Sequence, residues 1–209
     1  MPTFIAPVLN YGILAPNLIV LGGALIGVLV EAFAPRKSRS SSQLFIAVVT
    51  LVIALAALLR TRGVYSTKAA MSSITFDGAG FLLQGSILVI SLIAILLLAD
   101  SDKFAAAPTA VPGSDEERQA QAANIRVTEI YPLTLFAIAG MMLFPVATDL
   151  ITLFVALEVL SLPLYLMAGL SRRRRLLSQE SALKYFLLGA FSSAFFLFGA
   201  AYLYGFSGS

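Results

Sequence analysis

One carboxylate interrupts an otherwise apolar stretch of the sequence. Glu158 lies among Leu157, Val159 and Leu160, in a run from residue 150 to residue 171 that carries no other charge. A charge at the centre of a membrane helix costs at least about 2.5–3.5 kcal/mol, so ionisable residues there usually face a cavity or a partner and mark ion or proton paths. We therefore interpret Glu158 as a functional residue on an ion or proton path. The alternative is a structural, protonated glutamate that is bonded to a neighbouring helix.

A proline follows Glu158 five residues later in the same run. Pro163 has no N–H, so the carbonyl of Val159 loses its helical hydrogen-bond donor. The freed carbonyl needs another partner, and water supplies one if the helix lines a hydrated cavity. Two interpretations stay open together: a proton site beside a loosened carbonyl, and a helix that Pro163 kinks for packing.

The second ionisable residue is Lys184, in the run Ser178-Gln-Glu-Ser-Ala-Leu-Lys-Tyr. If the helix begins at Ser178, Lys184 lies about 9 Å along it. A desolvated amine at that depth can release and take up a proton. Alternatively, the side chain snorkels back to the headgroups, or it pairs with Glu180 at i,i+4. We expect Glu158 and Lys184 at different depths, with no direct ion pair between them.

The composition places both residues in a membrane protein. Of the 209 residues, 59% are hydrophobic and 12% are charged, which is about half the charge of an average soluble domain. The uncharged blocks are long enough to cross a bilayer core as helices, which takes about 17–25 residues. None of them alternates as a barrel strand would. We predict an all-α membrane protein with six transmembrane helices, at about residues 13–34, 43–60, 79–99, 131–147, 150–170 and 181–206.

The sequence contains no cysteine and no histidine. This excludes disulfides, thiolate metal sites, Fe–S ligation by cysteine and the usual haem ligands. No glycine-rich dinucleotide loop follows a predicted strand. We therefore expect no metal or cofactor in this chain, and any redox centre on other chains. The amino terminus has no basic segment before its apolar stretch, so no cleavable signal peptide is predicted.

Lysine and arginine fall unequally on the two sides that six helices define. Ten lie in the connections after the first, third and fifth predicted helices, and three lie in those after the second and fourth. Positive residues stay on the cytoplasmic side, so both chain ends are predicted to face outward. The run Arg172–Arg175 is then a cytoplasmic anchor near anionic headgroups. Nucleic-acid binding is the alternative for this run, but we expect no nucleic-acid partner.

One long connection divides the chain. It contains more acidic than basic side chains and the run Ala105-Ala-Ala-Pro-Thr-Ala-Val-Pro-Gly113, which is typical of a linker. A capping box at Ser114-Asp-Glu-Glu predicts a short surface helix within it. We divide the chain into helices 1–3 (residues 1–99), a cytoplasmic linker (100–130) and helices 4–6 (131–209).

Small residues predict where helices approach one another closely. Gly23 and Gly27 form a GxxxG pair in the first helix, and the last helix is rich in glycine, alanine and serine. Such faces allow close contact between membrane helices. We expect packing within the protein, with an oligomer or partner contact of the first helix as the alternative.

The runs around the two ionisable residues together resemble a known family. They are Ala156-Leu-Glu-Val-Leu-Ser-Leu-Pro-Leu-Tyr165 and Ser178-Gln-Glu-Ser-Ala-Leu-Lys-Tyr-Phe-Leu-Leu-Gly-Ala-Phe-Ser-Ser193. Both are similar to the subunit N family of proton-pumping NADH:quinone oxidoreductase (respiratory complex I), one of the antiporter-like membrane subunits. The strong match covers about residues 129–209, and the combined pattern of the two helices is specific.

The resemblance implies a role in proton translocation. In the family, a glutamate of helix 5 that matches Glu158 takes part in translocation, and a lysine of helix 6 matches Lys184. Helices 4–6 would begin an inverted five-helix repeat of an antiporter-like fold. The resemblance also implies a membrane-arm subunit in the bacterial cell (inner) membrane, coupled to quinone reduction. NAD, FMN, Fe–S clusters and quinone are then expected on partner subunits, and the other membrane subunits of complex I are the expected partners.

Family members are more than twice as long as this chain, so we do not expect it to form a complete proton path alone. Subunits of multi-subunit cation/proton antiporters and membrane-bound hydrogenases also carry the helix 5 glutamate, and they are the alternative family. The run Ser-x-Glu-x-x-Leu-Lys-Tyr-Phe favours subunit N. A passive assembly subunit, in which Glu158 is structural, is the alternative from another class.

Overall fold

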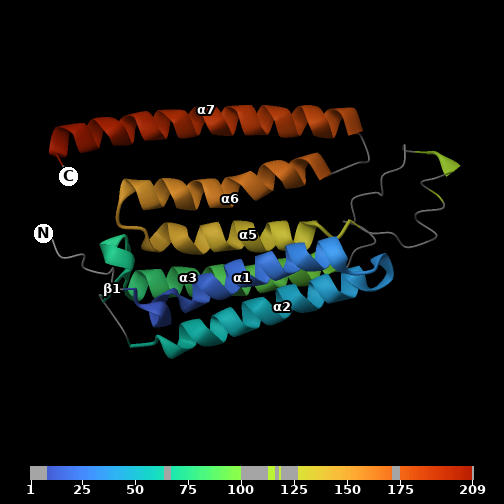
Figure 1. The fold of residues 1–209 in the computed structure, drawn as a ribbon, viewed down its shortest axis with the longest axis horizontal. Coiled ribbons are helices and arrows are strands. Elements are labelled where there is room, and N and C mark those ends of the chain that lie inside the picture. Colours follow the sequence, from blue (N-terminus) through green and yellow to red (C-terminus); the bar gives the residue numbers. More distant parts are fainter. Residues whose placement is uncertain are drawn as a thin grey trace, which may run out of the picture.

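The computed structural model describes residues 9–63, 67–99, 113–115, 118, 127–170 and 175–208. The long helices lie side by side as a bundle (Figure 1). The helices are α1 (Tyr11–Phe33), α2 (Arg36–Arg60), α3 (Gly78–Ala99), α5 (Ile130–Leu143), α6 (Leu150–Leu170) and α7 (Arg175–Ser207). All but α5 contain an apolar stretch long enough to cross a membrane. The predicted all-α membrane fold is therefore confirmed.

The helix predicted over residues 131–147 is observed as an α-helix that is shorter than the other five. It forms α5 and then a 3₁₀ turn, η2 (Phe144–Val146), which contains Pro145. A proline favours the end of an α-helix because it cannot donate to the carbonyl four residues before it. α5 contacts α1, α2, α3 and α6, and more than half of its residues are buried. It is the central helix of the bundle rather than one that faces lipid along its whole length.

The helices form successive layers. In Figure 1, α7 lies on α6, α6 lies on α5, and α5 lies on the group of α1, α2 and α3. The hydrophobic core is built from α1, α2, α3, α5 and the short strands between α2 and α3. The start of α1 and the end of α7 lie at the same end of the bundle (Figure 1). Which side of the membrane this end faces stays a prediction.

Two glycines of α1 pack inside the protein, as the GxxxG pair predicted. A Cβ atom on Gly23 would overlap the side chain of Thr50 on α2, and one on Gly27 would lie 3.0 Å from Cβ of Pro132 on α5. Most of the predicted linker, most of the predicted surface helix, and residues 172–174 of the predicted anchor run Arg172–Arg175 lie outside the described residues. Within them, the Arg118 N–H donates to the Ser114 carbonyl at 3.3 Å.

A hairpin that the sequence analysis did not predict lies between α2 and α3. Strands β1 (Thr67–Ala69) and β2 (Ile74–Phe76) pair antiparallel around a 3₁₀ turn, η1 (Ala70–Ser72). Ile74 also forms a bridge with Ala147, and the Thr148 N–H donates to the Ser73 carbonyl at 3.0 Å. The hairpin therefore holds the connection that leads into α6.

Asp149 is the N-cap of α6. Its Oδ1 accepts from the Thr152 N–H at 2.7 Å and its Oδ2 accepts from the Thr152 hydroxyl at 2.8 Å. The Thr152 N–H holds the pKa of the Asp149 carboxyl below its ordinary value. Burial opposes this shift, and the hydroxyls of Thr152 and Ser73 reinforce it. The cap satisfies an N–H group that has no partner within the helix.

The backbones of α5 and α6 touch at Gly140. A Cβ atom there would lie 2.8 Å from the Leu160 Cα and 2.9 Å from the Ala156 carbonyl oxygen. Both obstacles are backbone atoms of α6, which cannot rotate away as a side chain can. Ala156 is fully buried at the same contact. Glycine at position 140 therefore sets how closely α6 packs on the rest of the bundle.

Replacing Gly140 by alanine tests this contact. We expect Gly140→Ala to force the two helices apart and to destabilise the protein by about 1–3 kcal/mol or more, the usual range for overpacking. Thermal unfolding of the detergent-solubilised protein measures the loss. Gly199→Ala is the matched control because no atom lies within 4 Å of a Cβ at that position, and it should be neutral or stabilising. Equal melting temperatures for the two variants would contradict the proposed constraint.

The Asp149 cap predicts a pH dependence of stability. Because the folded state lowers this pKa below its ordinary 3.8, the charged cap contributes its full stability above that pH, and the contribution is lost as pH falls through the folded value. We expect Asp149→Ala to cost about 0.5–2 kcal/mol at neutral pH. Asp149→Asn keeps a capping oxygen without the titration. Unfolding of the three proteins between pH 7 and pH 2 should show the wild type losing its advantage over the asparagine variant only under acid conditions.

Candidate functional site

The carboxylate of Glu158 faces α7. Glu158 lies near the middle of α6 and its side chain is half-buried. The Ser193 hydroxyl of α7 donates a hydrogen bond to Glu158 Oε1, and Ser193 itself is buried. From Leu150 the glutamate is eight residues along the helix, or about 12 Å. The structure therefore gives the predicted mid-membrane carboxylate a hydroxyl partner on the next helix.

α6 and α7 pack antiparallel and keep one residue register along their contact. A residue further along α6 therefore contacts a residue equally far back along α7. The matched pairs are Phe154 with Phe196, Glu158 with Ser193, Tyr165 with Phe186, and Gly169 with Ala182. The ring centroids of the first pair lie 6.1 Å apart and those of the third lie 5.8 Å apart. The Glu158–Ser193 hydrogen bond is thus enclosed between an aromatic pair on each side along the contact between the two helices.

Pro163 lies on the other face of α6. At about 100° per residue, Pro163 shares a face with Ala156 and Leu160, which contact Gly140 of α5, and Glu158 lies almost opposite. Pro163 is buried, and α6 continues through it as one helix. The proline and the carboxylate are neighbours in sequence but face different helices.

Lys184 lies far from Glu158. Its side chain is 69% exposed, and its Nζ lies 2.5 Å from Oε1 of Glu180. Ser193, which marks the level of Glu158, comes nine residues later on α7, or about 13 Å further along the axis. Lys184 pairs with Glu180, one of the alternatives that the sequence left open, and the depth of both site residues in a membrane stays a prediction. The two predicted site residues are not brought together.

Ser193 is the hydrogen-bond partner of Glu158 that the sequence analysis does not predict. The sequence analysis treats the serines of the last helix only as small residues. A search for hydroxyl donors on the neighbouring helix would have found both serines, but only the alignment of α6 and α7 separates them. Ser193 is buried against Glu158, whereas Ser192 is exposed.

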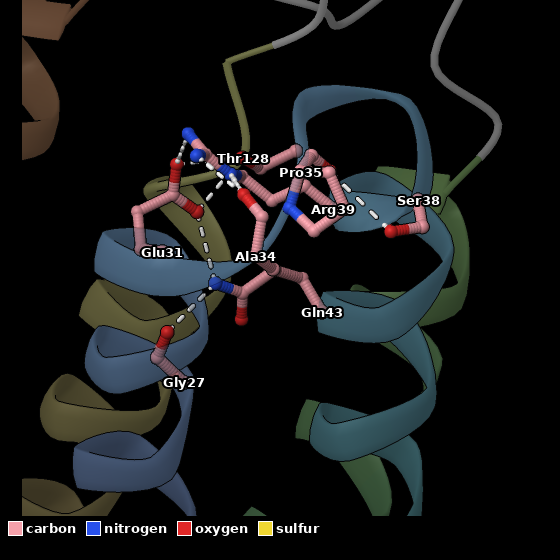
Figure 2. A network of polar contacts seen from close by, with 8 residues as sticks. All are labelled: Gly27, Glu31, Ala34, Pro35, Ser38, Arg39, Gln43 and Thr128. Carbon is pink, nitrogen blue, oxygen red and sulfur yellow. Dashed lines mark hydrogen bonds and ion pairs between the residues drawn. The ribbon is translucent and has the colours of Figure 1, made fainter.

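A second carboxylate, Glu31 at the end of α1, is the centre of a polar network (Figure 2). Its oxygens accept from Arg39 Nη1 at 2.9 Å, from Gln43 Nε2 at 2.9 Å, and from the Thr128 hydroxyl at 2.8 and 2.9 Å. Gln43 also donates to the Gly27 carbonyl at 2.8 Å. Gln43 and Thr128 are buried. The network joins α1 and α2 to Thr128, which lies two residues before α5.

A third polar cluster joins α1, α3 and α5. The Nε2 group of Gln84 donates to Asn17 Oδ1 at 3.1 Å and to the Met142 carbonyl at 2.9 Å. Met142 lies in the last turn of α5, where carbonyls lack helical donors, so Gln84 caps this helix from another helix. Within the described part of the chain, Oε1 of Gln84 is the buried side-chain oxygen without a partner. In the same part, no three acidic residues gather as metal ligands would.

Comparison with known proteins first identifies the class. Residues 147–209, from the start of α6 to the end of α7, match the transmembrane family described as NADH:quinone oxidoreductase/Mrp antiporter. In a solved structure of respiratory complex I from Thermus thermophilus with bound aureothin, one chain is similar to this protein, with a TM-score of 0.65 and 31% identity. The similarity covers 93% of this chain and 37% of that one.

The particular relatives are curated NADH-quinone oxidoreductase N subunits. The chain is 54% identical to that of Acidothermus cellulolyticus over 98% of its own length, and 52% identical to that of Mycobacteroides abscessus. The match covers 40% and 41% of these two relatives, so the chain spans about two fifths of their length. The resemblance to subunit N, restricted to its amino-terminal portion, is confirmed.

The Glu31 network gives a testable stability prediction. Glu31→Ala removes the acceptor of Arg39, Gln43 and Thr128 together, and hydrogen bonds to charged groups contribute about 1.5–3 kcal/mol. We expect a loss of that size in the free energy of unfolding of the detergent-solubilised protein. Glu180→Ala is the control, since its ion pair with Lys184 is exposed and such pairs contribute about 0–1 kcal/mol. A loss no larger than that of the control would show that the network does not hold the helices.

Proposed function

We propose that this chain forms part of a membrane-arm subunit of NADH:quinone oxidoreductase that takes part in proton translocation coupled to quinone reduction. The observation that carries the proposal is a half-buried carboxylate, Glu158, at mid-helix in a membrane span, hydrogen-bonded to Ser193 on the next helix. The similarity to subunit N along 98% of the chain supports the assignment of this carboxylate to that enzyme.

In the proposed mechanism Glu158 alternates between its charged and its protonated form. The Ser193 hydroxyl donates to the carboxylate, and when Glu158 is protonated its own O–H becomes a donor. Ionisable residues at this depth usually mark ion or proton paths, which supports this role for Glu158. The reaction moves a proton and no electron, so we propose that NAD, FMN, Fe–S clusters and quinone are bound by partner subunits.

Lys184 is proposed as the proton-transfer residue on the cytoplasmic side, nine residues before the level of Glu158. Its present partner is Glu180, so a proton-carrying role requires the amine to leave this ion pair. The snorkelling anchor is the alternative role, and the exposure of the side chain supports it. The proposed location is the bacterial inner membrane, with both chain ends on the outer face.

The alternative proposal is a subunit of a related cation/proton antiporter or membrane-bound hydrogenase. The matched family includes Mrp antiporters in its description, which is the observation that favours it. Purification of the complex that contains this chain decides between the two. NADH:quinone activity in the purified complex supports the first proposal, and a complex with antiport or hydrogenase activity instead would replace it.

Glu158→Gln tests the role of the carboxylate. Glutamine keeps the size and the hydrogen-bonding capacity of the side chain but does not titrate, so the complex should assemble. We expect the number of protons translocated per quinone reduced to fall in membrane vesicles. Glu129→Gln, which makes the same change outside the long apolar spans, is the control. An unchanged ratio in an assembled Glu158→Gln complex would make Glu158 a structural residue.

A further inference from the structure

The contact between α6 and α7 contains a hydroxyl that the proposed mechanism does not use. Tyr165 is on α6, two turns beyond Glu158 and on the same face, and its residue exposure is 9%. Its ring packs edge-on against Tyr185, with centroids 4.6 Å apart, and against Phe186 at 5.8 Å. Among the residues that the structure describes, the Tyr165 hydroxyl oxygen is not fully buried, since the buried side-chain oxygen without a partner is Oε1 of Gln84.

The ring of Tyr165 rests on Gly189 of α7. A Cβ atom on Gly189 would lie 2.5 Å from Cζ of Tyr165 and would overlap the hydroxyl oxygen. Any other residue at position 189 would therefore displace the hydroxyl. The absence of a side chain at this one position allows the hydroxyl to lie against the backbone of α7.

The position of this hydroxyl relates it to Glu158. By the alignment of the two helices Tyr165 lies opposite Phe186, but its hydroxyl reaches Gly189, three residues closer to Ser193. Side chains lean toward the start of their own helix, which for Tyr165 is the direction of Glu158. Gly189 and Ser193 are four residues apart on one face, or about 6 Å. The hydroxyl is thus about one helical turn from the Glu158–Ser193 hydrogen bond.

A separation of this size is bridged by one water molecule. Two O–H···O hydrogen bonds in series, each about 2.7–2.8 Å long, span about 5.5 Å. The Tyr165 hydroxyl oxygen is not fully buried, so water can reach it, and a tyrosine hydroxyl can both donate and accept a hydrogen bond. Phenylalanine would fill the same space without a hydroxyl, so the tyrosine is accounted for if its hydroxyl takes part in a hydrogen-bonded row.

We propose that the Tyr165 hydroxyl relays protons between Glu158 and the side of the membrane on which Lys184 lies, through one water on either side of it. Protonated Glu158 gives its proton to the first water, that water gives one of its own to the Tyr165 oxygen, and the original Tyr165 proton passes to the second water. One proton moves, one O–H bond breaks for each that forms, and no electron is transferred. This relay rests on the proposed function of Glu158.

Tyr165→Phe in the intact complex is the test. The substitution keeps the ring on Gly189 and the packing against Tyr185, and it removes only the hydroxyl. In inside-out membrane vesicles that oxidise NADH, we expect the protons translocated per quinone reduced to fall as far as they do in Glu158→Gln, with assembly unchanged on a native gel. Tyr202→Phe is the matched control, because Tyr202 is a 68% exposed tyrosine of α7 that packs on Phe198.

Gly189→Ala is the second variant, since it keeps the hydroxyl but moves it. The relay predicts the same fall in the ratio for Gly189→Ala as for Tyr165→Phe. A wild-type ratio in Tyr165→Phe, alongside a reduced ratio in Glu158→Gln, overturns the relay and leaves the function of Glu158 standing. A wild-type ratio in Glu158→Gln overturns the function itself. A Tyr165→Phe chain that does not assemble also overturns the relay, because the hydroxyl would then be structural.

Discussion

The close contact of α5 and α6 at Gly140 is the constraint on which the candidate site depends. Because the backbones touch there, one face of α6 is fixed against α5, and Ala156 is the small residue that allows it. A helix with one face fixed has no remaining freedom to rotate. The side chain of Glu158, on the opposite face, must then point toward α7, where Ser193 meets it. A glycine on one helix thus decides which helix supplies the partner of a carboxylate on the next.

α5 must itself be held for this contact to position Glu158. A membrane provides little hydrophobic driving force between helices, so close packing of small residues and hydrogen bonds fix their arrangement. α5 is held at both ends in this way: at its start by the Glu31 network through Thr128, and at its end by Gln84 through the Met142 carbonyl. Glu31 of α1 and Gln84 of α3 therefore act on the position of α6 through α5, although neither residue lies on α5 or α6.

The sequence predicts the helices and the carboxylate well, because both depend on local properties. Long uncharged runs need only length and composition to be recognised, and Glu158 is conspicuous in its run. What the sequence does not predict depends on the relative alignment of helices. The choice of Ser193 over Ser192, the separation of Pro163 from Glu158, and the convergence of Arg39, Gln43 and Thr128 on Glu31 follow from contacts between distant segments. The hairpin before α3 was missed because its strands have only three residues each.

The number of hydrogen-bond donors around Glu158 bears on its role. A carboxylate offers about four acceptor sites, and in the described part of the chain the Ser193 hydroxyl is the side-chain donor that reaches it. A permanently charged Glu158 would leave most of these sites unfilled at mid-membrane, where the cost is high. A permanently protonated one would need only this partner and one acceptor for its own proton. Water that reached the contact between α6 and α7 would fill the remaining acceptor sites, and access of water is also what the proposed proton transfer requires.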